Sequence, residues 1–156
     1  MVCRYNQSMS SQPLELLHQL FGYEHFRGRQ EEIIKTASEG RDTLVLMPTG
    51  GGKSICYQIS GLLRKGLTIV VSPLIALMQD QVSALQQIGI EAAFLNSSLS
   101  AAEQRKVLDN VANETIKILY IAPERLVQPH TLQRFRNTTL SLIAIDEAHC
   151  VSQWGR

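Results

Sequence analysis

Short, mainly apolar runs alternate with longer amphipathic segments along most of this chain. The apolar runs lie at residues 43–47, 67–71, 90–95, 116–122 and 140–145. Runs of this length without a regular polar face are typical of strands that are covered on both sides. They predict a buried, mainly parallel sheet.

The segments between these runs carry apolar residues at helical spacing. They predict helices over residues 13–21, 30–38, 53–64, 73–88, 100–112 and 131–136. Glycines 22, 40, 66 and 89 end four of these helices, and Ser100 with Glu103 forms a capping box at the start of another. Strands alternating with helices predict an α/β three-layer domain over residues 13–156, preceded by a polar tail over residues 1–12.

Composition places only moderate limits on the domain number, the binding partners and the cysteine chemistry of the protein. The chain has 156 residues, of which 44% are apolar and 19% charged, and this suits one globular domain. The formal net charge is +1, so a nucleic-acid surface would have to be local. Cys3, Cys56 and Cys150 are far apart and form no CxxC pair, which argues against a disulfide framework or a zinc site.

The ends and the hydropathy of the chain indicate an intracellular protein. Residues 1–12 lack the apolar run of a signal peptide, and no stretch approaches the roughly 18 apolar residues of a membrane span. Unpaired cysteines fit a reducing compartment. We therefore expect a cytoplasmic protein.

A glycine-rich turn lies between the run at 43–47 and the helix predicted from residue 53. It reads Met47, Pro48, Thr49, Gly50, Gly51, Gly52, Lys53 and Ser54. Glycines allow backbone N–H groups to turn onto phosphate oxygens, and the following helix directs its positive end to the same place. Lys53 would reach the β- and γ-phosphates, and Ser54 would bind Mg²⁺.

The alternative for this segment is a flexible glycine turn without a ligand. The strict phosphate-loop pattern begins with glycine, whereas this run begins with Met47. Lysine and serine nevertheless follow the glycines directly, between a predicted strand and a predicted helix. These two features favour an ATP-binding phosphate loop.

Two carboxylates follow the last apolar run. Asp146 and Glu147 come directly after residues 140–145, at the carboxyl end of a strand, where sheets of this class bind ligands. Asp146 would hold Mg²⁺, and Glu147 would orient and deprotonate the attacking water. The alternative is a solvated acidic turn, but the pairing with a phosphate loop favours nucleoside-triphosphate hydrolysis.

Together these segments resemble the superfamily-two helicases, and most closely the RecQ family of DNA helicases. The resemblance extends from Leu17 to Gly155 and includes the methionine that opens the phosphate loop. It rests on these stretches: Phe21–Gln30, Met47–Ser54, Val71–Ile75, Leu95–Ser97, Tyr120–Leu126 and Asp146–Gly155. It implies a RecA-like ATP-binding domain that couples ATP hydrolysis to 3′–5′ unwinding of DNA in recombination and repair.

The resemblance also assigns an adenine-recognition element ahead of the phosphate loop. Tyr23 would stack on the adenine ring, and Gln30 would form paired hydrogen bonds with adenine N6 and N7. Arg27 belongs to the same element. Without the resemblance, the aromatic residues here would be read as core packing.

Further roles are implied for loops that follow the strands. Ser72, Pro73, Asn96 and Arg125 would contact the backbone of single-stranded or partly duplex DNA, although from sequence alone each segment reads as a helix-capping loop. His149 would link the γ-phosphate to neighbouring loops. Trp154 would sense DNA within an aromatic-rich loop, in which Arg156 departs from the family's usual histidine.

Three other functions remain open from the sequence. An RNA-stimulated ATPase shares the Asp-Glu-Ala-His signature of residues 146–149. A binding module without turnover is the second, and a small-molecule phosphate-loop kinase is the third. A helicase of this type needs a second RecA-like domain, so we expect this chain to be the N-terminal part of one, truncated within its first domain.

Overall fold

The computed structural model describes residues 13–39 and 52–146, which form two compact units divided at Gly66. The predicted strand at 43–47 lies outside the described residues, as do Met47, Pro48, Thr49, Gly50, Gly51, Glu147, His149 and Trp154. Among the described helices, none is both long and apolar enough to cross a membrane.

The first unit is helical in its described residues. Its elements are α1 (Pro13–Leu16), the π-helical turn η1 (Leu17–Phe21), α2 (Gln30–Ser38) and α3 (Lys53–Leu62). The helix predicted over residues 13–21 therefore changes to a π-helical turn at Leu17 and ends at Gly22, whose φ is 72°. Helices α2 and α3 pack together, and Ile34 and Ile59 are buried completely.

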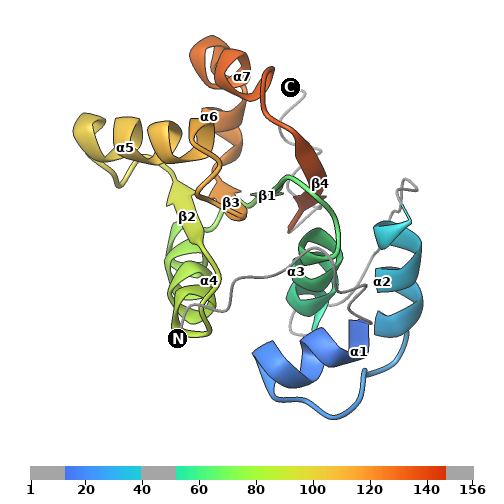
Figure 1. The fold of residues 1–156 in the computed structure, drawn as a ribbon. Helices are drawn as coiled ribbons and strands as arrows, with labels where there is room; N and C mark the ends of the chain where they lie inside the picture. The colour runs from blue at the N-terminus through green and yellow to red at the C-terminus, as the bar shows by residue number, and fades with distance from the viewer. Residues whose placement is uncertain (1–12, 40–51, 147–156) are drawn as a thin grey trace. The chain divides into compact units, whose positions relative to one another are not determined.

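The second unit is a parallel sheet with helices on both faces (Figure 1). Its strands are β1 (Leu67–Val71), β2 (Ala92–Leu95), β3 (Ile118–Ile121) and β4 (Leu140–Ile145). Its helices are α4 (Ile75–Gln87), α5 (Ala101–Ala112), α6 (Pro123–Leu126) and α7 (Pro129–Phe135). The strand order is β2-β3-β1-β4, and every described pairing is parallel. The predicted α/β class is confirmed.

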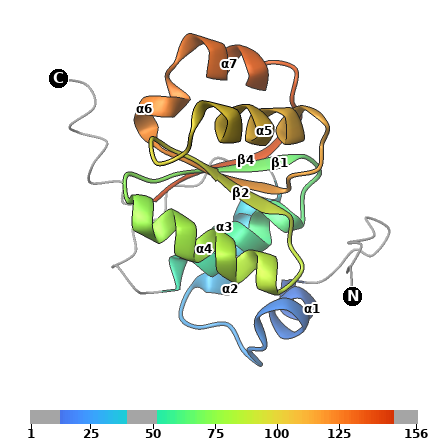
Figure 2. The same cartoon turned by 90° about the vertical axis from the view of Figure 1, so that its left-hand side faces the viewer.

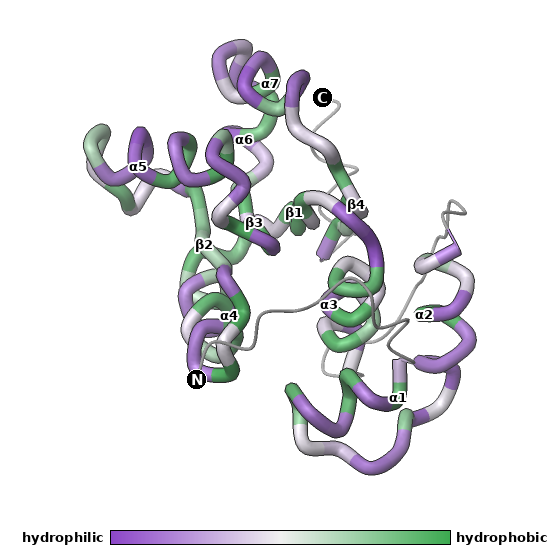
Figure 3. Tube along the Cα trace, viewed as in Figure 1, coloured by the Kyte–Doolittle hydropathy of each residue, from purple (hydrophilic) through white to green (hydrophobic). Residues whose placement is uncertain are grey.

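Helices cover the sheet on opposite sides. Figure 2 shows α4 on one face and α5 and α7 on the other, which gives three layers within this unit. Tyr120 of β3 reaches the α4 side, where its hydroxyl oxygen lies 3.4 Å from Oε1 of Gln81 in α4. Figure 3 shows hydrophobic and hydrophilic turns alternating along α4 and α5, as expected for helices with one buried side.

The core on the α5 and α7 side is formed by apolar side chains from the strands and both helices. Its members are Leu67, Ile69, Val71, Leu95, Leu108, Val111, Leu119, Ile121 and Phe135. Strands β1 and β3 are buried along their whole length, as their sequences predict. Strand β4 differs: it is one of the two outer strands among those described, and its Ile143 and Ile145 are 56% and 49% exposed.

The remaining differences from the predicted elements are small and lie at their ends. Helix α4 begins at Ile75 rather than at Pro73, because Ser72 and Pro73 form a turn in which the Ser72 hydroxyl accepts a hydrogen bond from the Leu74 N–H. The capping box of Ser100 and Glu103 is present at the start of α5. The short helix α6 was not predicted from the sequence. It begins at Pro123, whose fixed φ suits a first helical position.

Hydrogen bonds around Gly66 connect chain segments at the sheet edge opposite the predicted ligand edge. The Leu67 N–H donates to the Thr139 carbonyl at 2.8 Å, and the Lys117 ammonium donates to the Gly66 carbonyl at 2.7 Å. Burial lowers the pKa of Lys117. Gly66 has a φ of 108°, and a Cβ at this position would lie 2.5 Å from the Thr139 carbonyl oxygen. Only glycine fits there without a shift of the backbone.

We predict that Gly66→Ala lowers the free energy of unfolding by about 1–3 kcal/mol, because it adds both backbone strain and a clash with backbone atoms. Urea titration followed by circular dichroism measures this loss. Gly28→Ala is the matched control, since Gly28 has a φ of 53° but nothing within 4 Å of an added Cβ. Equal losses in the two variants would show that the contact with Thr139 costs nothing.

Candidate functional site

The described end of the phosphate loop opens helix α3. Gly52 is the N-cap residue with a φ of 76°, and Lys53 and Ser54 are the first two helical residues, both half-buried. The first turn of α3 carries no acidic residue, so its N–H groups and the Lys53 charge present a positive end to an anion. This arrangement is suited to holding phosphate.

Gln30 connects the predicted adenine element to this turn. Its side chain is 3% exposed. Its Nε2 donates to the Gly52 carbonyl at 3.1 Å, and its Oε1 accepts from the Arg27 N–H at 2.8 Å. The structure therefore brings together three residues that the sequence assigned to two separate motifs.

The Gln30 amide also explains why position 52 is glycine. A Cβ on Gly52 would clash with Gln30 Nε2, so the glutamine side chain would have to move, and the positive φ would add backbone strain. The Gly52 turn is thus in contact with a residue 22 positions earlier in the chain.

The loop between η1 and α2 carries the other two residues of the adenine element. Tyr23 is 49% exposed, and the Arg27 side chain is also exposed. Tyr23 is therefore accessible to a planar ring. One contact to this loop was not predicted from the sequence: Nε2 of His18 in η1 lies 2.7 Å from the Glu24 carbonyl. A histidine on the polar side of a predicted helix gives no signal for such a contact.

Cys56 lies one turn after Gly52 and is 5% exposed. Burial raises the pKa of its thiol to about 11, and the sulfur lies 3.8 Å from the Gly52 carbonyl. A thiol with this pKa stays protonated at neutral pH, so it packs as a small apolar group.

Asp146 lies in the second unit, directly after β4. It is 5% exposed, and its N–H donates to the Val71 carbonyl at 2.8 Å. This bond continues the β1–β4 ladder one residue beyond the strand and holds the backbone of Asp146 at the carboxyl edge of the sheet. A buried carboxylate at that edge supplies the hard oxygen ligand that Mg²⁺ prefers.

The predicted DNA-contacting residues follow β1, β2 and β3 at the same edge, because the strands are parallel. Ser72 and Asn96 are 1% and 0% exposed. The Asn96 Oδ1 accepts from the Ser98 N–H at 2.9 Å, and its Nδ2 lies 3.5 Å from the Met78 sulfur. The Ser72 and Asn96 side chains thus shape their turns, whereas Ser97 and Ser98 are exposed.

The other two residues of this group are more accessible. Pro73 and Arg125 are half-buried, and Arg125 Nη1 donates to the Gln128 side chain at 3.1 Å. Arg125 lies in the short helix α6, which begins after β3. Its guanidinium can therefore reach the same edge as the turns after β1 and β2.

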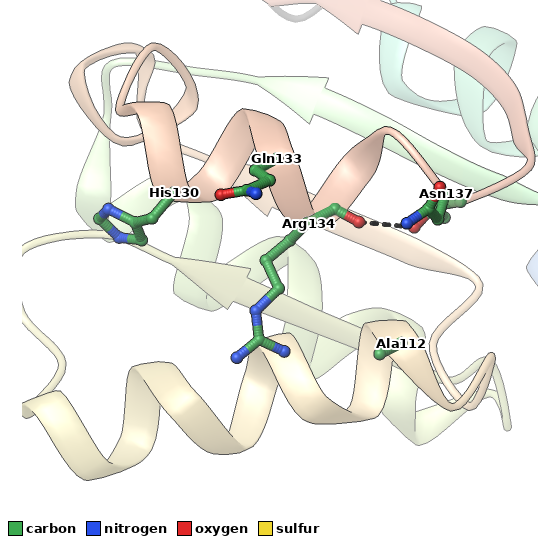
Figure 4. Close-up of a pocket in the computed structure, with 6 residues that line it drawn as sticks. Ala112, His130, Gln133, Arg134 and Asn137 are labelled. Carbon is green, nitrogen blue, oxygen red and sulfur yellow. Dashed lines mark hydrogen bonds between the residues drawn. The ribbon is translucent and has the colours of Figure 1, made fainter.

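A separate hollow of about 330 Å³ lies between α5 and α7 (Figure 4). It is lined by Ala112, His130, Gln133, Arg134, Asn137 and Thr138. Arg134 points toward α5 and is paired with Asp109 at 3.4 Å. None of the predicted site residues lines this hollow.

Comparison with known proteins agrees with the motifs. The family model described as DEAD/DEAH box helicase matches residues 27–156. The chain is 49% identical over 142 residues to the ATP-dependent DNA helicase RecQ of Pasteurella multocida, which covers 91% of this chain and 22% of that protein. The resemblance to RecQ helicases is confirmed.

Two further relatives, also ATP-dependent DNA helicases RecQ, are equally similar. The protein of Haemophilus influenzae is 50% identical over 91% of this chain and 23% of its own length. The protein of Bacillus subtilis is 50% identical over 90% of this chain and 24% of its own length. The chain thus spans less than a quarter of the length of each of these three relatives. Since the family model covers most of the chain, including Gln30, the phosphate loop and the acidic pair, the chain belongs to the DEAD/DEAH box helicase family.

Proposed function

We propose that this chain is the ATP-binding, RecA-like part of a RecQ-type DNA helicase, which couples ATP hydrolysis to 3′–5′ unwinding of DNA in recombination and repair. The observation that supports the proposal is the hydrogen bond from Gln30 to Gly52, because it links the residue that would read adenine to the turn that would hold phosphate. The helicase would work on cellular DNA, in the nucleoid or in a nucleus, together with a second RecA-like domain.

Adenine recognition is compatible with the bonds that Gln30 already makes. A side-chain amide has two N–H donors and an oxygen with two lone pairs. Gly52 and Arg27 use one donor and one lone pair. The remaining N–H and lone pair match adenine N7 and the N6 amino group. The two existing bonds would orient the amide, and Tyr23 would stack on the ring.

The triphosphate would lie against the N-terminus of α3. Backbone N–H groups of Met47, Thr49, Gly50, Gly51 and Gly52 would surround the phosphate oxygens, while Pro48, which has no N–H, would shape the loop. Lys53 would neutralise charge that develops on the γ-phosphoryl group. The Ser54 hydroxyl and the Asp146 carboxylate are hard oxygen donors that fit Mg²⁺. When bound, the ion would neutralise phosphate charge.

Hydrolysis would depend on the residues just past β4. Glu147 would accept a proton from the attacking water, and His149 would relay the state of the γ-phosphate to neighbouring loops. An arginine from the second RecA-like domain would stabilise the transition state. Binding and hydrolysis would thus require different parts of the protein.

DNA would bind at the carboxyl edge of the sheet. Because the Ser72 and Asn96 side chains are buried, their turns would present backbone groups and the exposed Ser97 and Ser98 hydroxyls to phosphates. Pro73 would shape the first turn, Arg125 would add a positive charge, and Trp154 would stack on a base. Such contacts are independent of sequence and suit single-stranded or partly duplex DNA.

We predict that Lys53→Ala weakens ATP binding by at least roughly tenfold, because charge-assisted hydrogen bonds to phosphate are worth about 1.5–3 kcal/mol each. Isothermal titration calorimetry with ATP and Mg²⁺ measures this loss. Lys35→Ala removes the same charge from an exposed position near the end of α2 and is the control. Unchanged affinity in Lys53→Ala would remove the phosphate-loop assignment.

Gln30→Ala is expected to reduce the preference for ATP over GTP by about tenfold, since it removes the amide that would read adenine N6 and N7. Competition binding with the two nucleotides measures the preference. Gln19→Ala changes an exposed glutamine of the same unit and should leave the preference intact. If Gln30→Ala bound both nucleotides as the wild type does, the adenine element would have to lie elsewhere.

In a complete protein with both RecA-like domains, Glu147→Gln should keep ATP affinity within about twofold and lower kcat by roughly a hundredfold or more. Steady-state ATPase assays with and without single-stranded DNA measure this effect. The wild type should be strongly stimulated by DNA, and more so at low salt. If single-stranded DNA does not stimulate the wild-type ATPase activity, the helicase proposal is contradicted. Normal turnover by Glu147→Gln would exclude that residue as the base.

A further inference from the structure

His18 is bonded to the loop that carries Tyr23 through both its main chain and its ring. It lies in η1, and its carbonyl accepts from the Gly22 N–H at 3.2 Å. Its ring Nε2 lies 2.7 Å from the Glu24 carbonyl, six residues further along the chain. A carbonyl oxygen can only accept, so Nε2 must carry the proton. Both the neutral tautomer with a proton on Nε2 and the imidazolium meet that condition.

These hydrogen bonds are made by the residues just before and just after Tyr23 in the sequence. Gly22, with its φ of 72°, reverses the chain just before Tyr23, and the bond from His18 holds the carbonyl just after it. At the far end of the same loop, Gln30 accepts from the Arg27 N–H. The loop over residues 22–29 is therefore held at both ends, while the Tyr23 ring stays half exposed.

We infer that His18 is a positioning residue for recognition of a purine base, because its Nε2–H bond to the Glu24 carbonyl holds Tyr23 where it can stack on the ring. The inference rests on the proposed adenine role of Tyr23 and Gln30. A loop already held in its bound conformation loses less entropy when the ligand binds. The His18 ring is itself exposed, so its hydrogen bond should matter more for base affinity than for the stability of the whole protein.

The test compares His18→Leu with His18→Gln in the full 156-residue chain. Leucine removes the donor, whereas the glutamine Nε2–H can occupy nearly the same place as the histidine Nε2–H. Isothermal titration calorimetry with ATP, GTP and inorganic tripolyphosphate, each with Mg²⁺, separates base binding from phosphate binding. His25→Leu changes an exposed histidine of the same loop and is the control.

We expect His18→Leu to weaken ATP binding by roughly three- to tenfold, the range typical of one hydrogen bond. Tripolyphosphate affinity and the urea midpoint should stay at wild-type values, and His18→Gln should restore ATP affinity. A His18→Leu variant that binds ATP normally would overturn the inference alone. Equal weakening toward ATP and tripolyphosphate would overturn it too, since that indicates general damage to the unit. A wild-type chain that does not prefer ATP to GTP would remove the proposed adenine site, and this inference with it.

Discussion

The parallel pairing of β1 with both β3 and β4 is the constraint on which the second unit depends. The backbone ladder extends past the ends of these strands, where the Ser72 N–H donates to Ile121 at 3.1 Å and the Asp146 N–H donates to Val71 at 2.8 Å. At the other edge, the Thr68 and Ser141 hydroxyls form a buried pair at 2.7 Å where the β1–β4 register shifts. Because parallel strands share one direction, this register alone brings every strand's carboxyl end, and therefore Asp146, to one edge.

A different kind of interaction organises the first unit. Burying an amide is costly unless it is hydrogen-bonded, and Gln30 meets this condition through Arg27 and Gly52. These bonds fix the amide without using all of its hydrogen-bonding capacity. Residues that shape a site and residues that read a ligand are often distinct, but in the proposed site Gln30 would do both.

The burial of Ser72 and Asn96 alters how DNA contact at the sheet edge has to be understood. Both side chains bond to N–H groups two residues further on, at Leu74 and Ser98. Such side-chain turns leave the outer backbone and small hydroxyls for a ligand. In the proposed function, a surface of this kind would contact phosphates without distinguishing bases, as movement along any DNA sequence would require. The turn residues in these motifs would therefore matter for loop shape rather than for direct contact.

The sequence by itself determined the α/β class, the capping box at Ser100, the family resemblance and the positions of β1 and β4. Each depends on local spacing or on a contiguous motif, which short-range physics encodes. The short helix α6 and the π-helical turn at Leu17 were not predicted, because each depends on a few backbone hydrogen bonds that leave no periodic pattern in the sequence.

Only the tertiary structure decided that Gln30 bonds to Gly52, that Gly66 meets Thr139, and that Ser72 and Asn96 are buried. These contacts join residues far apart in the chain or depend on how a loop packs. Each of these contacts depends on the close approach of two backbone segments, or of a side-chain amide and a backbone segment. The order of residue types along the chain does not show which segments come close together.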